Sequence, residues 1–293
     1  MRKLSVPEWC CAVRFNDSDD TYLIENTQEP FTVIKDSYRY WTADPFLFKY
    51  ENEYYLFFEM FDRLKRKGLL GCRKVSKTGY GKMHIIYECD SHLSYPFIYE
   101  ENGNIYIMPE SGKSGEVFRL KCIDFPEKWE KESVLIKERL ADTTMVSVDN
   151  TKYYLSEKVD DSNVFDRLDL YYEENGAITE CENNPVKLDL NTARCAGKVF
   201  EYKGDLIRPS QDCGLSYGEK LNFNKIIEIS KSGYAEETIK TVLVKDIGLN
   251  CENHFSGIHT YNKLDHVEVI DLKIGANFNI LNIIGAVLKR LRR

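Results

Sequence analysis

The chain has 293 residues, a hydrophobic fraction of 43% and a formal net charge of −7. The negative charge argues against nucleic acid as a partner, because a protein that binds the phosphate backbone needs a basic face. No apolar stretch is long enough to span a bilayer, and the N-terminal residues lack the apolar core of a secretory signal. The nine cysteines are scattered and odd in number, so we expect reduced thiols in a cytoplasmic protein and no thiolate metal site.

The first predicted elements are a strand at Trp9–Phe15 and a hairpin at Ala43–Glu59. The hairpin sequence is ADPFLFKYENEYYLFFE, in which two aromatic runs flank a polar break. Aromatic and β-branched residues suit a half-buried pleated surface, and a short polar break between two such runs is typical of a turn. Asp44 stands at the head of this hairpin and Glu59 stands at its foot.

This hairpin pattern recurs along the chain. Tyr95–Glu110 and Asp142–Glu157 repeat it, and in all three copies the head and the foot are 15 positions apart. Two weaker copies with shorter turns follow at Ala196–Ser210 and Gly257–Asp271. Units of roughly 40–50 residues that are rich in short strands are typical of β-propeller blades. Similar hairpins in an ordinary all-β protein are the alternative. The constant interval favours repeats, so we predict an all-β, five-bladed β-propeller over residues 1–275.

Two segments lie outside these repeats. We expect Trp9–Phe15 to complete the last blade, because that pairing removes an exposed sheet edge. Residues 276–293 place apolar side chains at helical spacing from Ile280 to Leu291, and four Lys or Arg residues cluster at the end. This pattern predicts an amphipathic basic helix. Two interpretations stay open: the helix packs across the propeller, or it binds an anionic surface on the inner face of a membrane.

The repeat also predicts where polar groups gather. In a propeller the innermost strand of each blade lines the central channel, so the five heads surround one mouth of that channel. The residues at or beside these heads are Asp44, Tyr95, Asp142, Arg194 and His259. Such a cluster is typical of an active or binding site. Each carboxylate also has an ordinary interpretation, because an aspartate before a proline often starts a turn and the foot glutamates can pair with cations between blades.

A longer set of motifs carries a family resemblance. The motifs are ADPF at 43–46, SYPF at 94–97, MPES at 108–111, ADTT at 141–144, ARCAGKVF at 193–200, IRPSQDC at 207–213, YG at 217–218 and GIHTYN at 257–262. Together they resemble the propeller domain at the N-terminus of plant glucosamine inositolphosphorylceramide transferases, a domain that also occurs alone in bacterial proteins. The first blade is more distantly similar to the five-bladed propellers of glycoside hydrolase family 43.

The hydrolase resemblance implies acid–base chemistry on a glycosidic bond. It implies a base aspartate in blade one, which Asp44 matches, a modulating aspartate in blade two and an acidic glutamate in blade three. Tyr95 stands where the second aspartate is expected, while Asp142 and Glu157 are the head and foot carboxyls of blade three. The candidate catalytic residues are Asp44, Glu110 and Asp142.

Transfer from a nucleotide-sugar is the chemistry we expect, because the second aspartate is missing and a phosphate leaving group needs cations. The candidate substrate-binding residues are Tyr95, Arg194, Lys198, Arg208, Gln211, Tyr217 and His259. The expected function is glycosyl transfer to a glycan or lipid-linked acceptor in cell-surface glycan synthesis. A family 43-like hydrolase and a non-catalytic glycan-binding propeller stay open. No cofactor or metal ion is predicted, and a divalent cation in the channel is left open.

Overall fold

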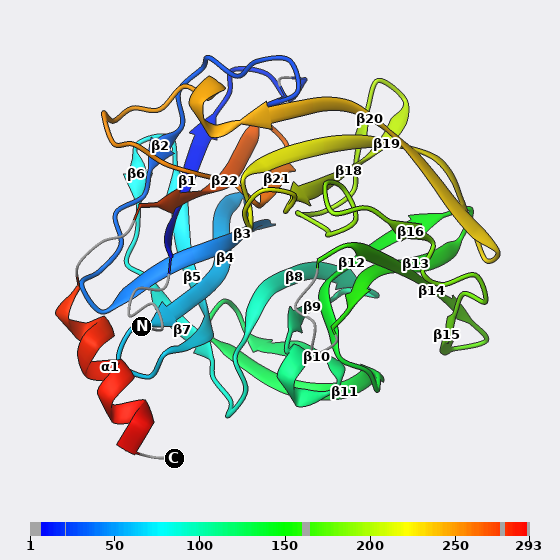
Figure 1. Ribbon diagram of the computed structural model, residues 1–293, viewed down its shortest axis with the longest axis horizontal. Helices are drawn as coiled ribbons and strands as arrows, with labels where there is room; N and C mark the ends of the chain where they lie inside the picture. Colours follow the sequence, from blue (N-terminus) through cyan, green and yellow to red (C-terminus); the bar gives the residue numbers. More distant parts are fainter. Residues whose placement is uncertain (1–6, 21, 160–164, 276–278, 292–293) are drawn as a thin grey trace.

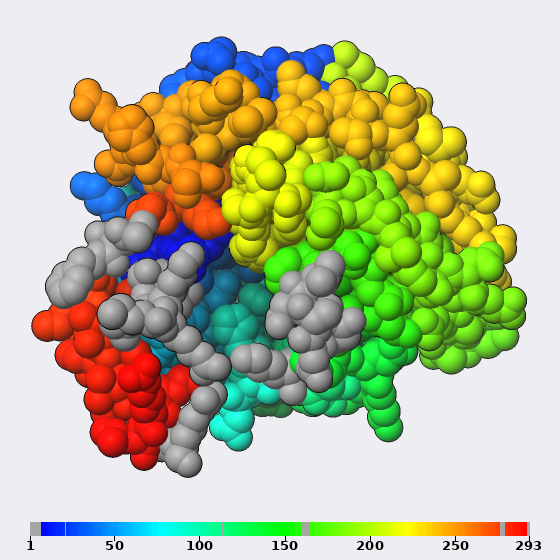
Figure 2. All heavy atoms as spheres, viewed as in Figure 1, coloured from blue at the N-terminus to red at the C-terminus, as the bar shows by residue number. Residues whose placement is uncertain are grey.

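The computed structural model describes residues 7–20, 22–159, 165–275 and 279–291. Within these residues the strands form five sheets of four or five strands each. Figure 1 shows the sheets arranged around a common centre, with helix α1 (Ile280–Leu291) on the outside. In the space-filling view of Figure 2 the centre of this face is hollowed. The predicted all-β, five-bladed propeller and its C-terminal helix are therefore confirmed.

Four of the blades consist of strands that follow one another in sequence. Blade one contains β3 (Tyr40–Tyr50), β4 (Glu53–Asp62), β5 (Lys67–Ser76), β6 (Gly79–Tyr80) and β7 (His84–Tyr87). Blade two contains β8 (Ser94–Glu101), β9 (Asn104–Glu110), β10 (Val117–Asp124) and β11 (Lys128–Ile136). Blade three contains β12 (Leu140–Val148), β13 (Thr151–Lys158), β14 (Arg167–Glu174), β15 (Ala177–Glu180) and β16 (Lys187–Leu188). Blade four contains β17 (Phe200–Tyr202), β18 (Asp205–Asp212), β19 (Lys220–Ser230) and β20 (Gly233–Leu243).

The fifth blade joins distant parts of the chain. It contains β21 (Tyr261–Leu264), β22 (Val267–Ile274), β1 (Glu8–Phe15) and β2 (Thr32–Val33). β1 pairs antiparallel with β22 along its whole length, from Glu8 opposite Ile274 to Phe15 opposite Val267. The expected closure by an N-terminal strand is confirmed, and it covers the edge that β22 would otherwise expose. Two short 3-10 helices, η1 (Gly112–Ser114) and η2 (Val244–Asp246), connect strands.

The heads of the first three blades share an unusual backbone conformation. Asp44, Tyr95 and Asp142 have φ angles of 50°, 44° and 49°, in the left-handed region that non-glycine residues rarely adopt. Each lies at a register shift between the first two strands of its blade. Such bulges bend a strand and change the direction of its side chains. The constant 15-residue interval therefore reflects one repeated bulge at the start of each innermost strand.

Aromatic packing between blades fixes the channel wall. Phe46 and Tyr95 are fully buried, and their rings meet edge to face with centroids 4.8 Å apart. Both belong to a continuous core that extends from blade one to blade three. Burying one such side chain contributes about 1.5–3 kcal/mol. The side chain at the head of blade two is thus part of the core as well as part of the channel.

The predicted tail helix is present as α1, and residues 276–278 and 292–293 of the predicted segment lie outside the described residues. Among the helices described, none combines the length and the apolar character needed to cross a membrane.

Candidate active site at the channel mouth

Asp44 lies at the head of β3 and is only 5% exposed. Its Oδ2 accepts a hydrogen bond from the Tyr95 backbone N–H at 3.1 Å, and its Oδ1 accepts one from the Thr260 hydroxyl at 3.1 Å. His259 Nε2 lies 3.5 Å from the same Oδ1. Burial raises the pKa of the Asp44 carboxyl from 3.8 to about 6, although His259 acts against this rise. Asp44 is therefore mostly ionised at neutral pH and is a stronger base than an exposed aspartate.

His259 is held between two carboxylates and an indole ring. Its Nδ1 lies 2.7 Å from Asp271 Oδ2, and its ring stacks on Trp9 with centroids 3.9 Å apart. Burial opposes a charge on His259, but Asp271 and Asp44 outweigh it and raise the pKa of the imidazole. Asp271 Oδ1 also accepts the backbone N–H groups of His259 and Thr260 at 3.0 Å. These contacts fix the imidazole against Asp44.

Arg194 holds the opposite side of the mouth together. Its Nε donates to Asp142 Oδ2 at 2.6 Å and its Nη1 donates to Glu157 Oε2 at 3.0 Å. Gln211 Nε2 donates to the same Asp142 oxygen at 2.9 Å. Burial raises the pKa of Glu157 to about 7, with Arg194 acting in the opposite direction. Since its guanidinium is already directed at buried carboxylates, Arg194 is engaged within the protein.

Glu110, at the foot of blade two, has the most exposed side chain of these carboxyl groups, at 18%. Its Oε2 accepts the backbone N–H of Asp142 at 3.3 Å and lies 3.6 Å from Arg194 Nη2. Burial and the nearby Asp142 raise the pKa of Glu110 well above its usual value, despite Arg194. Burial and Asp44 do the same to Glu59, the foot of blade one. Both carboxyl groups therefore hold a proton more tightly than an exposed glutamate does.

Tyr217 connects the two sides. Its ring centroid lies 5.3 Å from that of His259, in an edge-to-face arrangement, and 5.5 Å from Cζ of Arg194. Trp9 and Phe165 contact the same tyrosine ring, with centroids 6.2 Å and 5.5 Å away. An aromatic wall thus spans the mouth beside the carboxyl groups. Flat aromatic faces of this kind suit the apolar face of a sugar ring.

Three of the predicted binding residues, Tyr95, Gln211 and Lys198, make their contacts within the channel wall. The Tyr95 hydroxyl lies 2.7 Å from Thr144 Oγ1 and accepts the backbone N–H of Gly197 at 2.7 Å. Gln211 is 1% exposed and bridges Asp142 to the Cys195 carbonyl. Lys198 is half-buried with its Nζ 5.5 Å from the centroid of Phe97, and burial alone lowers its pKa to about 8.

Arg208 does not serve the mouth as predicted. It is fully buried in β18, and Glu236 of β20 accepts hydrogen bonds from its Nε at 2.8 Å and from its Nη2 at 2.5 Å. Nε also donates to the Tyr234 hydroxyl and Nη2 to the Thr192 carbonyl, while Nη1 donates to the Ala193 carbonyl and to Cys195 Sγ. No N–H group remains for a ligand phosphate. Arg208 belongs to the motif at 207–213, but its partner Glu236 lies two strands further along the blade.

Sequence reasoning missed Asp271 and Trp9 as parts of this site. Asp271 occupies the foot of blade five, the position that Glu59, Glu110 and Glu157 occupy in the first three blades, so the repeat itself carried the signal. Trp9 reaches His259 only because β1 completes the fifth blade. No local pattern in the sequence indicates that contact.

Among the described residues, Asp44, His259 and Asp271 form a group that could hold a cation. One ligand atom from each lies within 4.8 Å of the others. These three side chains are the candidate ligands for the divalent cation that the sequence leaves open. The direct Asp271–His259 contact accounts for the same atoms through an ion pair.

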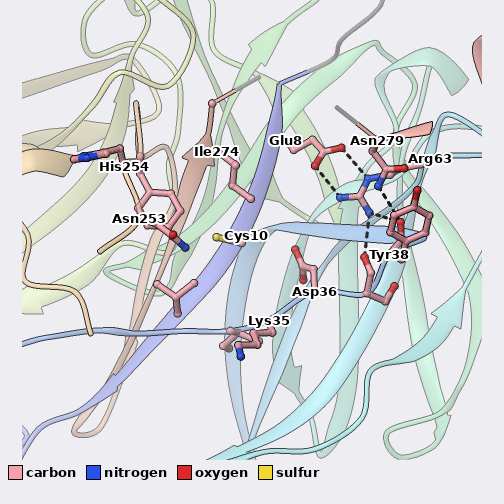
Figure 3. Close-up of a pocket in the computed structure, with 15 residues that line it drawn as sticks. Glu8, Cys10, Lys35, Asp36, Tyr38, Arg63, Asn253, His254, Ile274 and Asn279 are labelled. Carbon is pink, nitrogen blue, oxygen red and sulfur yellow. Dashed lines mark hydrogen bonds and ion pairs between the residues drawn. The ribbon is translucent and has the colours of Figure 1, made fainter. Parts of the chain in front are cut away.

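A cavity of about 770 Å³ lies away from the heads of the repeats. Glu8, Asp36, Tyr38 and Arg63 are among the residues around it (Figure 3). Arg63 donates from Nε and Nη2 to the two Glu8 oxygens at 2.8 Å and from Nη1 to the Ser37 and Tyr38 carbonyls. Arg63 and Glu8 of this cavity therefore already have partners within the protein.

The fold and the site together define a five-bladed β-propeller with carboxyl groups, an arginine and a histidine gathered at one channel mouth. Residues 32–281 match the family model described as "Glucosamine inositolphosphorylceramide transferase 1, N-terminal", so the chain belongs to this family.

Curated relatives carry the same name. The chain is 30% identical over 244 residues to glucosamine inositolphosphorylceramide transferase 1 of Arabidopsis thaliana, a match that covers 80% of this chain and 31% of the relative. It is 31% identical over 202 residues to the protein of that name from Oryza sativa subsp. japonica, covering 66% of this chain and 27% of the relative. The chain thus spans about a third of the length of the curated relatives it matches.

Solved structures share the fold at low sequence identity. A family 117 glycoside hydrolase from the marine bacterium Zobellia galactanivorans superposes with a TM-score of 0.55 and 11% identity over 92% of this chain and 91% of that one. The GH43_1 enzyme from Xanthomonas citri, complexed with xylotriose, gives a TM-score of 0.54 and 10% identity over 81% of this chain and 88% of that one. At such identities the likeness concerns the propeller fold alone.

Proposed function

We propose that this protein is a carbohydrate-active enzyme that breaks a glycosidic bond at the channel mouth and transfers the glycosyl group to an acceptor hydroxyl or to water. The observation that carries this proposal is the pair of carboxyl groups with separated pKa values. The pKa of Asp44 is raised to about 6, so this group is mostly ionised at neutral pH, whereas burial and Asp142 raise the pKa of Glu110 well above its usual value and favour its protonated form. Two carboxyl groups in opposite protonation states are what acid–base catalysis at a glycosidic bond requires.

Each group has a distinct role in this proposal. Asp44 removes the proton of the attacking hydroxyl or water, and its rigid contacts to Tyr95 and Thr260 hold the accepting oxygen in place. Glu110 donates its proton to the leaving oxygen, for which its side chain is the most accessible of the cluster. The aromatic wall around Tyr217 supports a sugar ring beside both.

Transfer from a nucleotide-sugar is the second candidate. It is favoured by the transferase name of the curated relatives. In that reaction Asp44 deprotonates the acceptor hydroxyl, and cations stabilise the departing phosphate. Among the described predicted cations, however, Arg194 is directed at Asp142 and Glu157 while Arg208 is sealed by Glu236. His259 is likewise paired with Asp271 and Asp44, and Lys198 lies against Phe97 in the channel wall. The mouth is therefore richer in carboxyl groups than in available cations, which favours a substrate without phosphate.

The test begins with thermal stabilisation by nucleotide-sugars and by neutral oligosaccharides, followed by turnover of a panel of aryl glycosides. Asp44→Asn should lower turnover by about 10²-fold or more with little change in ligand affinity, because the amide cannot accept the proton. Glu110→Gln should lose turnover on substrates with poor leaving groups and keep it on activated aryl glycosides, which need no acid. Stabilisation by nucleotide-sugars alone would favour the second candidate, and full turnover by Asp44→Asn would contradict both.

A further inference from the structure

We propose that helix α1 lays its outward face on the surface of an anionic bilayer. The first observation is how the helix is attached to the propeller. Asn282 and Gly285 are its buried residues, and a Cβ at Gly285 would lie 2.2 Å from the Arg63 carbonyl oxygen. Asn282 Nδ2 donates to Glu8 Oε1 at 2.8 Å, and Arg66 Nη1 donates to the Asn282 carbonyl at 3.3 Å. The small and polar side of α1 therefore faces the protein.

The apolar side of the helix faces outward. A surface helix ordinarily buries its apolar stripe against the core and leaves its polar side in water. In α1 the exposed apolar residues are Ile280 (51%), Ile284 (41%), Val287 (50%), Leu288 (40%) and Leu291 (78%). The propeller thus leaves the stripe uncovered, which removes the interpretation that the same stripe packs across it.

Charge complementarity identifies the occupant of this face. The last turn carries Lys289 and Arg290, both exposed, and the sequence continues with Arg292 and Arg293. Tyr38, 64% exposed, lies beside the start of the helix, where Asn279 donates to its carbonyl oxygen (Figure 3). An apolar stripe with cations at its border and a tyrosine nearby suits the boundary between lipid headgroups and acyl chains.

A bilayer explains this combination better than a protein groove does, because nothing in the stripe selects a partner of defined shape. The protein's net charge of −7 opposes a general attraction to anionic lipid, so the contact depends on the local basic cluster. The propeller also holds α1 in its helical form through Asn282 and Gly285. The ordering cost of binding is therefore lower than for a free peptide.

The test is co-sedimentation of the full chain with vesicles of phosphatidylcholine alone and of phosphatidylcholine mixed equally with phosphatidylglycerol. We expect binding to the anionic vesicles that weakens as NaCl rises from about 0.1 M to about 1 M, because the Debye length falls from about 10 Å to about 3 Å. Ile284→Glu combined with Val287→Glu should reduce binding to the level seen with phosphatidylcholine alone. Arg290→Glu should lower the partition coefficient by about fivefold or more.

Ile227→Glu is the matched control, since Ile227 of β19 is 57% exposed and lies outside the helix. It should bind like the unmodified protein, and every variant should keep the melting temperature. Equal sedimentation of the stripe variant and the unmodified protein would overturn the proposal. So would an unmodified protein that stays in the supernatant and forms a dimer that the stripe variant dissociates. If the variant with Ile284→Glu and Val287→Glu fails to fold, Arg290→Glu provides the test, and unchanged binding of that variant to anionic vesicles would overturn the proposal.

Discussion

Asp44 and Asp142 occupy the same position in two blades and differ in what surrounds them. Both stand at the head of an innermost strand, at a bulge, with φ near 50°. Asp142 is clamped by Arg194 at 2.6 Å and Gln211 at 2.9 Å. Asp44 instead receives a hydroxyl, a backbone N–H and a histidine at 3.5 Å.

The difference shows how a repeat acquires function. The repeated bulge determines where a head side chain lies, while the neighbouring blade determines its charge partner. In blade three that partner is a permanent cation, so Asp142 organises the wall. In blade one it is an imidazole that titrates, so Asp44 remains able to exchange a proton. Three experiments break or sharpen this comparison.

The largest effect is expected from Arg194→Met, which leaves Asp142 and Glu157 buried without their cation. Removing one partner of a buried ion network costs about 3–5 kcal/mol, because an uncompensated charge stays in a low-dielectric site. Urea denaturation at neutral pH measures this loss in the free energy of unfolding. Lys231→Met is the control, since Lys231 and its partner Glu174 are both nearly half exposed and such pairs contribute about 1 kcal/mol or less. A loss no larger than that of the control would show that Arg194 does not hold the wall.

A second effect is expected from the two isosteric substitutions at the heads. Asp142→Asn should destabilise the fold by about 2–3 kcal/mol, since it weakens a buried charge-assisted pair with Arg194. Asp44→Asn should stabilise it by about 1–2 kcal/mol at neutral pH, because burying an ionised carboxylate that has a raised pKa is unfavourable. Chemical denaturation of both variants supplies the comparison. If the free energy of unfolding changed by the same amount and in the same direction in both variants, the two aspartates would lie in equivalent environments.

The smallest effect is a pH dependence of stability in the unmodified protein. Asp44 and Glu157 have folded pKa values of about 6 and about 7, above their usual values, so the folded state binds more protons than the unfolded state at mildly acidic pH. The free energy of unfolding should therefore fall as pH rises from about 5 to about 8, by about 1 kcal/mol per unit. His259, whose pKa is also raised, acts in the same direction. Asp44→Asn and Glu157→Gln should each flatten the slope, and an unchanged slope in both would contradict the assignment.

The sequence predicted those features that depend on a repeating local pattern. The 15-residue interval between Asp44 and Glu59, its two copies and the two weaker copies with shorter turns together predicted the five blades. The family resemblance is confirmed by the match over residues 32–281. Features set by distant partners were not predictable. Arg208 belongs to one of the motifs, yet Glu236 on another strand determines its environment.

The tail shows the same limit in another form. The sequence predicts a helix with an apolar stripe and a basic end, and α1 has both. The sequence does not indicate which face packs against the propeller, because no local pattern marks Gly285 and Asn282 as contact residues. Their fit against Arg63 and Glu8 depends on the shape of blade one and β1.

The pairing of β1 with β22 has a consequence for how the chain reaches its native state. Every other long pairing in the described strands joins neighbours in sequence, whereas this one must wait until the four preceding blades have brought its partners together. Contacts between residues so far apart slow folding, since the entropy of the intervening loop is lost before the contact forms. Glu8 stands directly opposite Ile274, so a short loop between them would turn the closure into a hairpin. A circular permutant built in this way, with new ends in the turn between β2 and β3, would keep every native strand pair and lower the contact order of the fold.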